Sequence, residues 1–184
     1  SLKWAMAGRS KDKLASVRDA IGAPADTPLI VADAGDAASL KAMLAQTKSV
    51  ISTVGPYQLY GNELIAACVE SGTDYFDLCG EPVWMRQMID KHEAAAKASG
   101  ARIVFSCGFD SVPFELGTFF VQEEAKRVFG APAARVKGRV RDMRGTLSGG
   151  TAASAKATFD AVAKELSLVA ILNNPFALTP GFEG

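Results

Sequence analysis

The chain has 184 residues, with 20 Lys and Arg against 20 Asp and Glu, one His and 48% hydrophobic residues. This length is enough for one core of ordinary size, or for one domain and part of a second. Because the formal net charge is zero and no block of five Lys or Arg occurs, the chain has no basic surface that would gather phosphate backbones or acidic lipids. We therefore expect no nucleic-acid partner.

The apolar stretches are short and the cysteines are few. The stretch Leu166 to Leu172 falls short of the ~20 residues that a membrane span needs, and the first residues do not resemble a signal peptide. Cys68, Cys79 and Cys107 form neither a C-x-x-C pair nor a disulfide framework. These features predict a cytoplasmic protein with reduced thiols and no transmembrane segment. Because the chain does not begin with Met, we expect a fragment or a processed chain.

Strand-like and helical patterns alternate along the first 130 residues. Short apolar runs that end at turn residues predict strands at 2–7, 29–32, 49–54, 74–78 and 102–106. Apolar residues at helical spacing predict helices at 11–21, 36–44, 62–71, 83–99 and 114–129. This alternation is typical of βαβ units. It predicts the α/β class, with a doubly wound parallel sheet that is covered by helices on both faces.

The pattern changes after Gly130. Val and Gly alternate with Arg, Lys and Asp over residues 135–144, which predicts a half-exposed antiparallel strand, and a single helix is expected from 149 to 172. We place a domain boundary near residue 131. Residues 1–130 would form one domain, and residues 131–184 would begin a second, incomplete one.

Ligands of doubly wound sheets bind at the carboxyl ends of the strands, and Arg9 follows the first predicted strand. The glycine fingerprint G-x-G-x-x-G is absent, so residues 2–7 correspond to a second Rossmann strand if that loop lies upstream. Arg9 would then offer a guanidinium fork to the 2′-phosphate of NADP, and Ser10 a hydroxyl. Such a charge-assisted bond is worth roughly 1.5 to 3 kcal/mol. A solvated arginine at a helix start is the alternative.

Other strand ends carry weaker signals. Gly55 would let the backbone approach a ligand closely, although a tight turn with Tyr57 packed over it fits equally well. Asp110 and Ser111 could orient a substrate or a nicotinamide, or could cap the next helix. The carboxylates near the fourth strand have no His beside them, so we expect no metal site.

Several motifs in one order resemble a known family. The sequence VISTVGPY at 50–57 is followed by YGN at 60–62, GTDY at 72–75 and GE at 80–81. Together with AGRSK at 7–11, GFDSVP at 108–113 and SGGT at 148–151, these motifs resemble the saccharopine dehydrogenase-like oxidoreductases, and more closely their trans-acting enoyl reductase branch. The resemblance implies an NADP-linked reductase. Residues 1–130 would be its NAD(P)-binding, Rossmann-like domain without the first strand and glycine loop, and residues 131–184 would begin a second, substrate-side α+β domain that completes the substrate cleft.

The resemblance also implies roles for individual positions, although it names no catalytic acid or base. The adenosine half of the cofactor would meet residues that follow the first two predicted strands, namely Gly8, Arg9, Ser10 and Asp33. The ribose and nicotinamide would meet the loop of Thr53, Val54, Gly55, Pro56 and Tyr57. The substrate side would be formed by Phe109, Asp110, Ser111, Pro113, Gly150 and Thr151.

Two classes of function follow from these expectations. The first is hydride transfer from NADPH to an enoyl or acyl chain, or to an amino-acid-derived imine, in which the cofactor supplies the chemistry. The second is a Rossmann-type module that holds a nucleotide, or serves as a scaffold, without turnover. These 184 residues alone are expected to be inactive, and a homodimer is left open.

Overall fold

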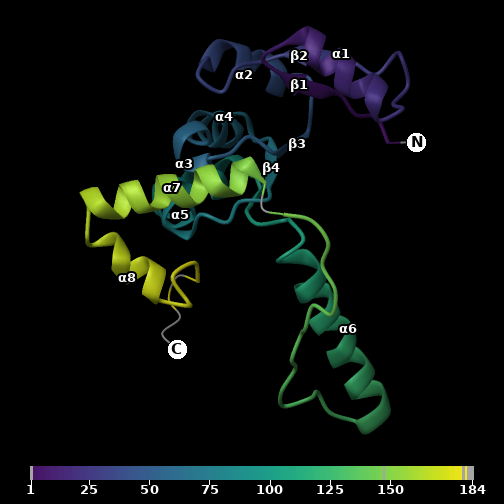
Figure 1. Cartoon of the computed structure of the whole chain (residues 1–184), viewed down its shortest axis with the longest axis vertical. Coiled ribbons are helices and arrows are strands. Elements are labelled where there is room, and N and C mark those ends of the chain that lie inside the picture. Colours follow the sequence, from purple (N-terminus) through teal and green to yellow (C-terminus); the bar gives the residue numbers. More distant parts are fainter. Residues whose placement is uncertain (1, 147, 180, 182–184) are drawn as a thin grey trace.

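The computed structural model describes residues 2–146, 148–179 and 181. Helices and strands alternate as the sequence predicts (Figure 1). The strands are β1 (Met6–Gly8), β2 (Leu29–Val31), β3 (Ser49–Ser52), β4 (Asp74–Asp77) and β5 (Ile103–Val104). The helices are α1 (Lys11–Ala20), α2 (Ala37–Leu44), α3 (Tyr57–Tyr60), α4 (Asn62–Ser71), α5 (Pro82–Ser99), α6 (Val112–Phe129), α7 (Gly149–Lys164) and α8 (Leu168–Asn173). The sequence analysis did not predict the short helix α3.

The strands form two parallel sheets in the described residues, where the sequence analysis predicts one. In one, β1 pairs with β2, and Gly8 lies opposite Val31. In the other, the order is β3, β4, β5, with Ser52 opposite Asp77 and Phe76 opposite Val104. Helical crossovers join the paired strands β1 and β2, β3 and β4, and β4 and β5, whereas no backbone ladder joins β1 or β2 to β3 in the described residues. The parallel α/β class is confirmed.

One face of the β3–β4–β5 sheet is covered and the other is open. Helices α2, α4 and α5 pack together over the covered face, where Ile65, Tyr75 and Trp84 are fully buried. Side chains alternate across a strand, so Ile51, next to the half-buried Val50, points to the opposite face and is 74% exposed. Val104 is also 42% exposed. The prediction of helices on both faces is therefore wrong for this sheet in the described residues.

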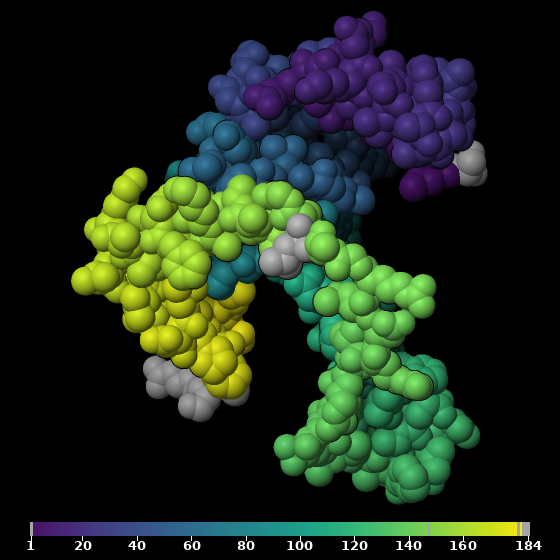
Figure 2. All heavy atoms as spheres, in the orientation of Figure 1, coloured from purple at the N-terminus to yellow at the C-terminus, as the bar shows by residue number. Residues whose placement is uncertain are grey.

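Helix α6 stands away from the rest of the molecule, and residues 131–146 run back along it (Figures 1 and 2). The side chain of Gln122 holds this segment through both of its amide atoms: Nε2 donates to the Ala133 oxygen at 3.0 Å, and Oε1 accepts from the Ala133 nitrogen at 2.7 Å. The strand predicted at 135–144 is wrong, since the described residues there form no ladder with any other segment. The segment contacts α6 instead, as where Gly138 lies against Phe114.

The helix predicted at 149–172 is two helices, α7 and α8. Between them, Glu165 has an extended backbone with φ −141°, and the Ser167 hydroxyl donates to the Glu165 carboxylate. This break turns α8 back onto α5, where Leu168 is buried. Burial of the apolar side of α8 on α5 thus decides where the long helix ends.

Candidate functional site

The first group of predicted site residues lies at the carboxyl ends of β1 and β2. Arg9 is exposed and lines a hollow of about 430 Å³ with Gly8, Ser10 and Lys13. Neither the Arg9 nor the Lys13 side chain makes an ion pair or hydrogen bond with another residue that the structure describes. The sequence analysis missed Lys13, although its spacing of four from Arg9, at the start of a helix, was a usable signal.

Ser10 and Asp33 shape the backbone around this hollow. Ser10 is the N-cap of α1, and its Oγ accepts a hydrogen bond from the Lys13 nitrogen at 3.4 Å. The Asp33 carboxylate accepts from the Gly35 nitrogen at 2.9 Å and so forms the turn that leads into α2. Because Gly8 pairs with Val31, Arg9 and Asp33 follow neighbouring strands at the same edge. We call the group Gly8–Ser10, Lys13 and Asp33 the open end.

The second group begins with the loop after β3. Thr53, Val54 and Gly55 are exposed, whereas Pro56 and Tyr57 are buried. The Tyr57 hydroxyl donates to the Ser52 oxygen at 3.1 Å, and its ring lies 5.6 Å from that of Trp84. Burial raises the pKa of Tyr57 to about 12, so its phenol is neutral at pH 7. The structure thus shows the tight turn with Tyr57 packed against it, and only residues 53–55 are free to meet a ligand.

A buried carboxylate that the sequence analysis left without a role holds this loop. Glu81 Oε1 accepts from the Tyr57 nitrogen at 2.8 Å and from Ser154 Oγ at 2.8 Å. Its Oε2 accepts from the nitrogen and the Nε2 of Gln58, at 3.0 Å and 2.9 Å. Since a carboxylate has about four lone-pair sites, four donors use its whole capacity. Glu81 therefore joins the β3–α3 loop to α7.

A second buried carboxylate, Asp77, lies at the end of β4. Its Oδ1 accepts from the Cys79 and Ser106 nitrogens at 3.0 Å and 2.8 Å, and its Oδ2 accepts from the Tyr75 hydroxyl at 2.9 Å. Burial raises the pKa of Asp77 although these three hydrogen bonds favour its charged form. Asp77 fixes the turns after β4 and β5. We call the group Thr53–Tyr57 and Asp77–Glu81 the buried end.

Two of the predicted substrate residues lie on α7, near the buried end. Gly150 and Thr151 are in its first turn, and Ser148 caps the helix by accepting from the Thr151 nitrogen at 3.1 Å. Ser154, one turn further on, lies close enough to Gly55 that a Cβ there would be 3.7 Å from its Oγ. The structure thus brings the first turns of α7 to the predicted nicotinamide loop.

The other predicted substrate residues lie at the start of α6. Phe109 is 61% exposed and meets Phe114 edge-on, and Asp110 is also exposed. Ser111 occupies the N-cap position of α6 but makes no side-chain cap hydrogen bond. Phe109 and Pro113 line a hollow of about 460 Å³ between α6 and residues 136–142. Among the described residues, no hydrogen bond links this loop to α7 or to residues 53–57.

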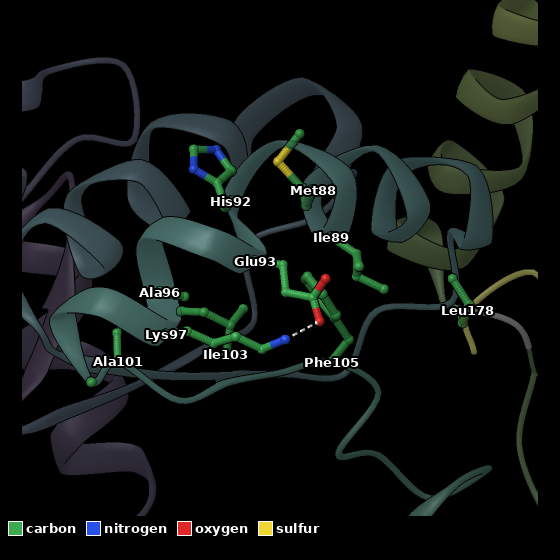
Figure 3. Close-up of a pocket in the computed structure, with 11 residues that line it drawn as sticks. Met88, Ile89, His92, Glu93, Ala96, Lys97, Ala101, Ile103, Phe105 and Leu178 are labelled. Carbon is green, nitrogen blue, oxygen red and sulfur yellow. Dashed lines mark hydrogen bonds and ion pairs between the residues drawn. The ribbon is translucent and has the colours of Figure 1, made fainter. Parts of the chain in front are cut away.

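Another pocket, of about 420 Å³, lies along α5 and β5 (Figure 3). Its wall includes Met88, Ile89, Ile103 and Phe105. The ion pair of Glu93 and Lys97, 2.9 Å apart and one turn apart on α5, also lies on this wall. It contains no residue that the sequence placed in a binding loop. This pocket is therefore separate from the candidate site.

The described residues also bear on the sequence predictions about a metal site, the cysteine thiols and a membrane span. Over residues 2–146, 148–179 and 181, no group of three His, Cys, Asp or Glu could hold a metal ion. Cys68 and Cys79 are free and buried, and burial raises the pKa of both thiols, that of Cys68 to about 12. Within the part of the chain that is described, no helix is long and apolar enough to cross a membrane.

Known proteins are similar to this chain in sequence and in fold. A trans-acting enoyl reductase of Mycobacterium ulcerans is 38% identical over 177 residues, which are 95% of this chain and 42% of that protein. A trans-acting enoyl reductase of Mycobacterium leprae is 51% identical over 116 residues, or 62% of this chain and 28% of that protein. The chain thus spans less than half the length of these relatives.

A solved structure shares the fold, and a family model matches the sequence. An apo, histidine-tagged saccharopine dehydrogenase (L-Glu forming) from Saccharomyces cerevisiae superposes with a TM-score of 0.53 at 17% identity, over 67% of this chain and 25% of that one, which shows a shared fold. Residues 1–104 match the family described as saccharopine dehydrogenase NADP binding domain. The resemblance seen in the sequence is confirmed: the chain belongs to the saccharopine dehydrogenase NADP binding domain family.

Proposed function

We propose that this chain binds NADPH as part of an oxidoreductase that reduces an enoyl or acyl-chain substrate. The observation that carries the proposal is the hollow at the end of β1, where Arg9 and Lys13 are cationic, exposed and unpaired with any other described residue. An anion there would gain two charge-assisted contacts without breaking any existing pair. The residues present fit the 2′-phosphate of NADP, which NAD lacks.

The proposed fold is a doubly wound sheet in which the two observed sheets are halves. In the Rossmann order 3-2-1-4-5-6, the strands equivalent to β1 and β3 flank the first strand, so a further strand would fit between them. The cofactor would then cross the carboxyl edge from the open end to the exposed residues 53–55. The division at residue 131 and the cytoplasmic location remain predictions from the sequence, and a homodimer remains open.

The substrate proposal rests on the relatives and on one apolar surface. Relatives that are 38% and 51% identical are named trans-acting enoyl reductases. The hollow beside Phe109 and Pro113 offers apolar side chains of the kind that would pack against an acyl chain. NADPH, when bound, supplies the hydride. The protein would orient the nicotinamide on the β3–α3 loop and keep water from it.

The test is a titration of the longer protein that carries this segment with NADPH and with NADH. We expect tighter binding of NADPH, and Arg9→Ala should weaken NADPH about 10- to 100-fold while hardly changing NADH. Lys13→Ala should act in the same direction, and Lys11→Ala is the matched control, because Lys11 lies on the same helix but does not line the hollow. If Arg9→Ala leaves the preference unchanged, Arg9 does not bind the phosphate. Binding of NADPH without turnover of any enoyl thioester would favour the non-catalytic module.

A further inference from the structure

The predicted cofactor loop and the predicted substrate helix share one buried anchor. Glu81 is 2% exposed, and its four hydrogen bonds go to two segments far apart in sequence, residues 57–58 and Ser154 of α7. No Lys or Arg of the described residues pairs with it. Its charge is therefore held by the groups whose positions it fixes.

A second contact strengthens the same link. Gln58 Nε2 also approaches Thr158 Oγ1 at 3.2 Å, and Thr158 Oγ1 in turn donates to the Ser154 oxygen at 3.0 Å. The first half of α7 is thus tied to the loop by Glu81 directly and by Gln58. In Figure 1, α7 crosses beside α3, as these hydrogen bonds require.

We propose that Glu81 is a positioning residue that makes the β3–α3 loop and the start of α7 move as one unit. This inference rests on the proposed function, because it assigns the loop to the nicotinamide and α7 to the substrate side. Binding of NADPH along residues 53–55 would then order Gly150 and Thr151 through Glu81. Cofactor binding would prepare the substrate side without any direct contact between NADPH and α7.

The chemistry of an amide shows why Glu81→Gln should break this link. A glutamine has one oxygen and one NH₂ group, so half of the four donors would face another donor. The Tyr57 and Gln58 nitrogens are backbone donors and cannot reverse their role. A buried donor without an acceptor costs free energy, so one backbone N–H would lose its anchor whichever way the amide turns.

Asp77→Asn is the matched control, since it also changes a buried carboxylate to an amide. The oxygen of the introduced asparagine can still accept hydrogen bonds from the backbone nitrogens of Cys79 and Ser106. Its NH₂ group can donate to the Tyr75 hydroxyl, which is able to accept. Asp77 makes no hydrogen bond to α7 among the described residues. The control therefore separates loss of a buried charge from loss of the link.

The experiment measures NADPH affinity and amide hydrogen exchange in the longer protein, for the wild type, Glu81→Gln, Asp77→Asn and Ser154→Ala. Glu81→Gln should raise the NADPH dissociation constant about tenfold and speed exchange both at 57–58 and in the first turns of α7. Asp77→Asn should change that constant by less than about threefold. Equal effects of the two variants would overturn the proposal.

Ser154→Ala tests the coupling itself. In the wild type, NADPH should slow exchange both in the loop and in the first turns of α7, whereas in Ser154→Ala, where only the Gln58–Thr158 contact still joins the two segments, the protection of α7 should be much smaller. Undiminished protection of α7 in Ser154→Ala would mean that the Glu81–Ser154 bond does not carry the coupling, and the inference would be wrong. If the wild type binds no NADPH, the proposed function fails, while exchange in Glu81→Gln still shows whether Glu81 holds both segments.

Discussion

The two strand ends of this molecule are built in opposite ways. At the open end, Arg9 and Lys13 are exposed cations that pair with no other residue in the described ranges, and the side chains of Ser10 and Asp33 accept hydrogen bonds from nearby backbone nitrogens. At the buried end, the carboxyl groups of Glu81 and Asp77 are almost wholly enclosed. Together they accept seven hydrogen bonds from other residues, four at Glu81 and three at Asp77. The first is therefore suited to capture a charged ligand, and the second to hold backbone in place.

This difference follows from how each end can stabilise charge. An exposed cation remains solvated, so it costs little to leave it unpaired until a phosphate arrives. A buried carboxylate must be surrounded by donors, because water cannot reach it. Consequently substitutions at the open end should affect binding with little change in stability, whereas substitutions at the buried end should also affect folding.

The largest expected effect is on stability, at Trp84, which packs against Tyr57 of the buried end. Trp84 is 2% exposed, packs against Tyr57 and Phe105, and donates from Nε1 to Asn62 Oδ1 at 2.7 Å. Trp84→Ala should lower the free energy of unfolding by about 3 to 5 kcal/mol in urea denaturation. Val17→Ala, a control at a half-exposed residue that lines the open hollow, should cost less than about 1 kcal/mol. Similar losses at the two positions would remove the contrast between the ends.

A smaller effect is expected on cofactor choice at the open end. Arg9→Lys keeps the charge but loses the planar fork that binds two phosphate oxygens together. Its NADPH dissociation constant should lie between those of the wild type and Arg9→Ala, and its unfolding free energy should stay within about 0.5 kcal/mol of the wild type. Fluorescence titration and denaturation of the same samples measure both. If Arg9→Lys binds NADPH as weakly as Arg9→Ala does, the planar geometry of the guanidinium, and not its charge, decides the preference for NADPH over NADH.

The smallest effect is a change in pH dependence at Asp77. Because burial raises its folded pKa above the unfolded value of 3.8, the folded state holds this proton more tightly. The stabilising contribution is present below pH 3.8 and is lost as the pH rises through the folded pKa. Asp77→Asn cannot lose a proton, so its stability relative to the wild type should increase as the pH rises from about 4 towards neutrality. Denaturation curves across that range with a constant difference would contradict the raised pKa.

Local patterns predicted most of the elements. Gly72, Gly100 and Gly130 end α4, α5 and α6 in the left-handed conformation that glycine tolerates, with φ of 70°, 80° and 76°, so these boundaries could be read from the sequence. The break between α7 and α8 could not, since no Gly or Pro marks it. Nor could the path of residues 131–146, because their alternation of polarity fits packing on a helix as well as pairing in a sheet.

The features of the candidate site also fall into those that the sequence indicated and those that only the tertiary structure showed. Sequence alone indicated the family, the α/β class, Arg9 and the loop at 53–57, because motif residues and strand ends are local features. Only the tertiary structure showed that Tyr57 is buried, that Lys13 joins Arg9, and that Glu81 connects the loop to α7 across 73 positions of sequence. Hydrogen bonds between distant segments depend on how helices pack over the sheet, and that packing arises from burial of apolar surface, which no short motif records.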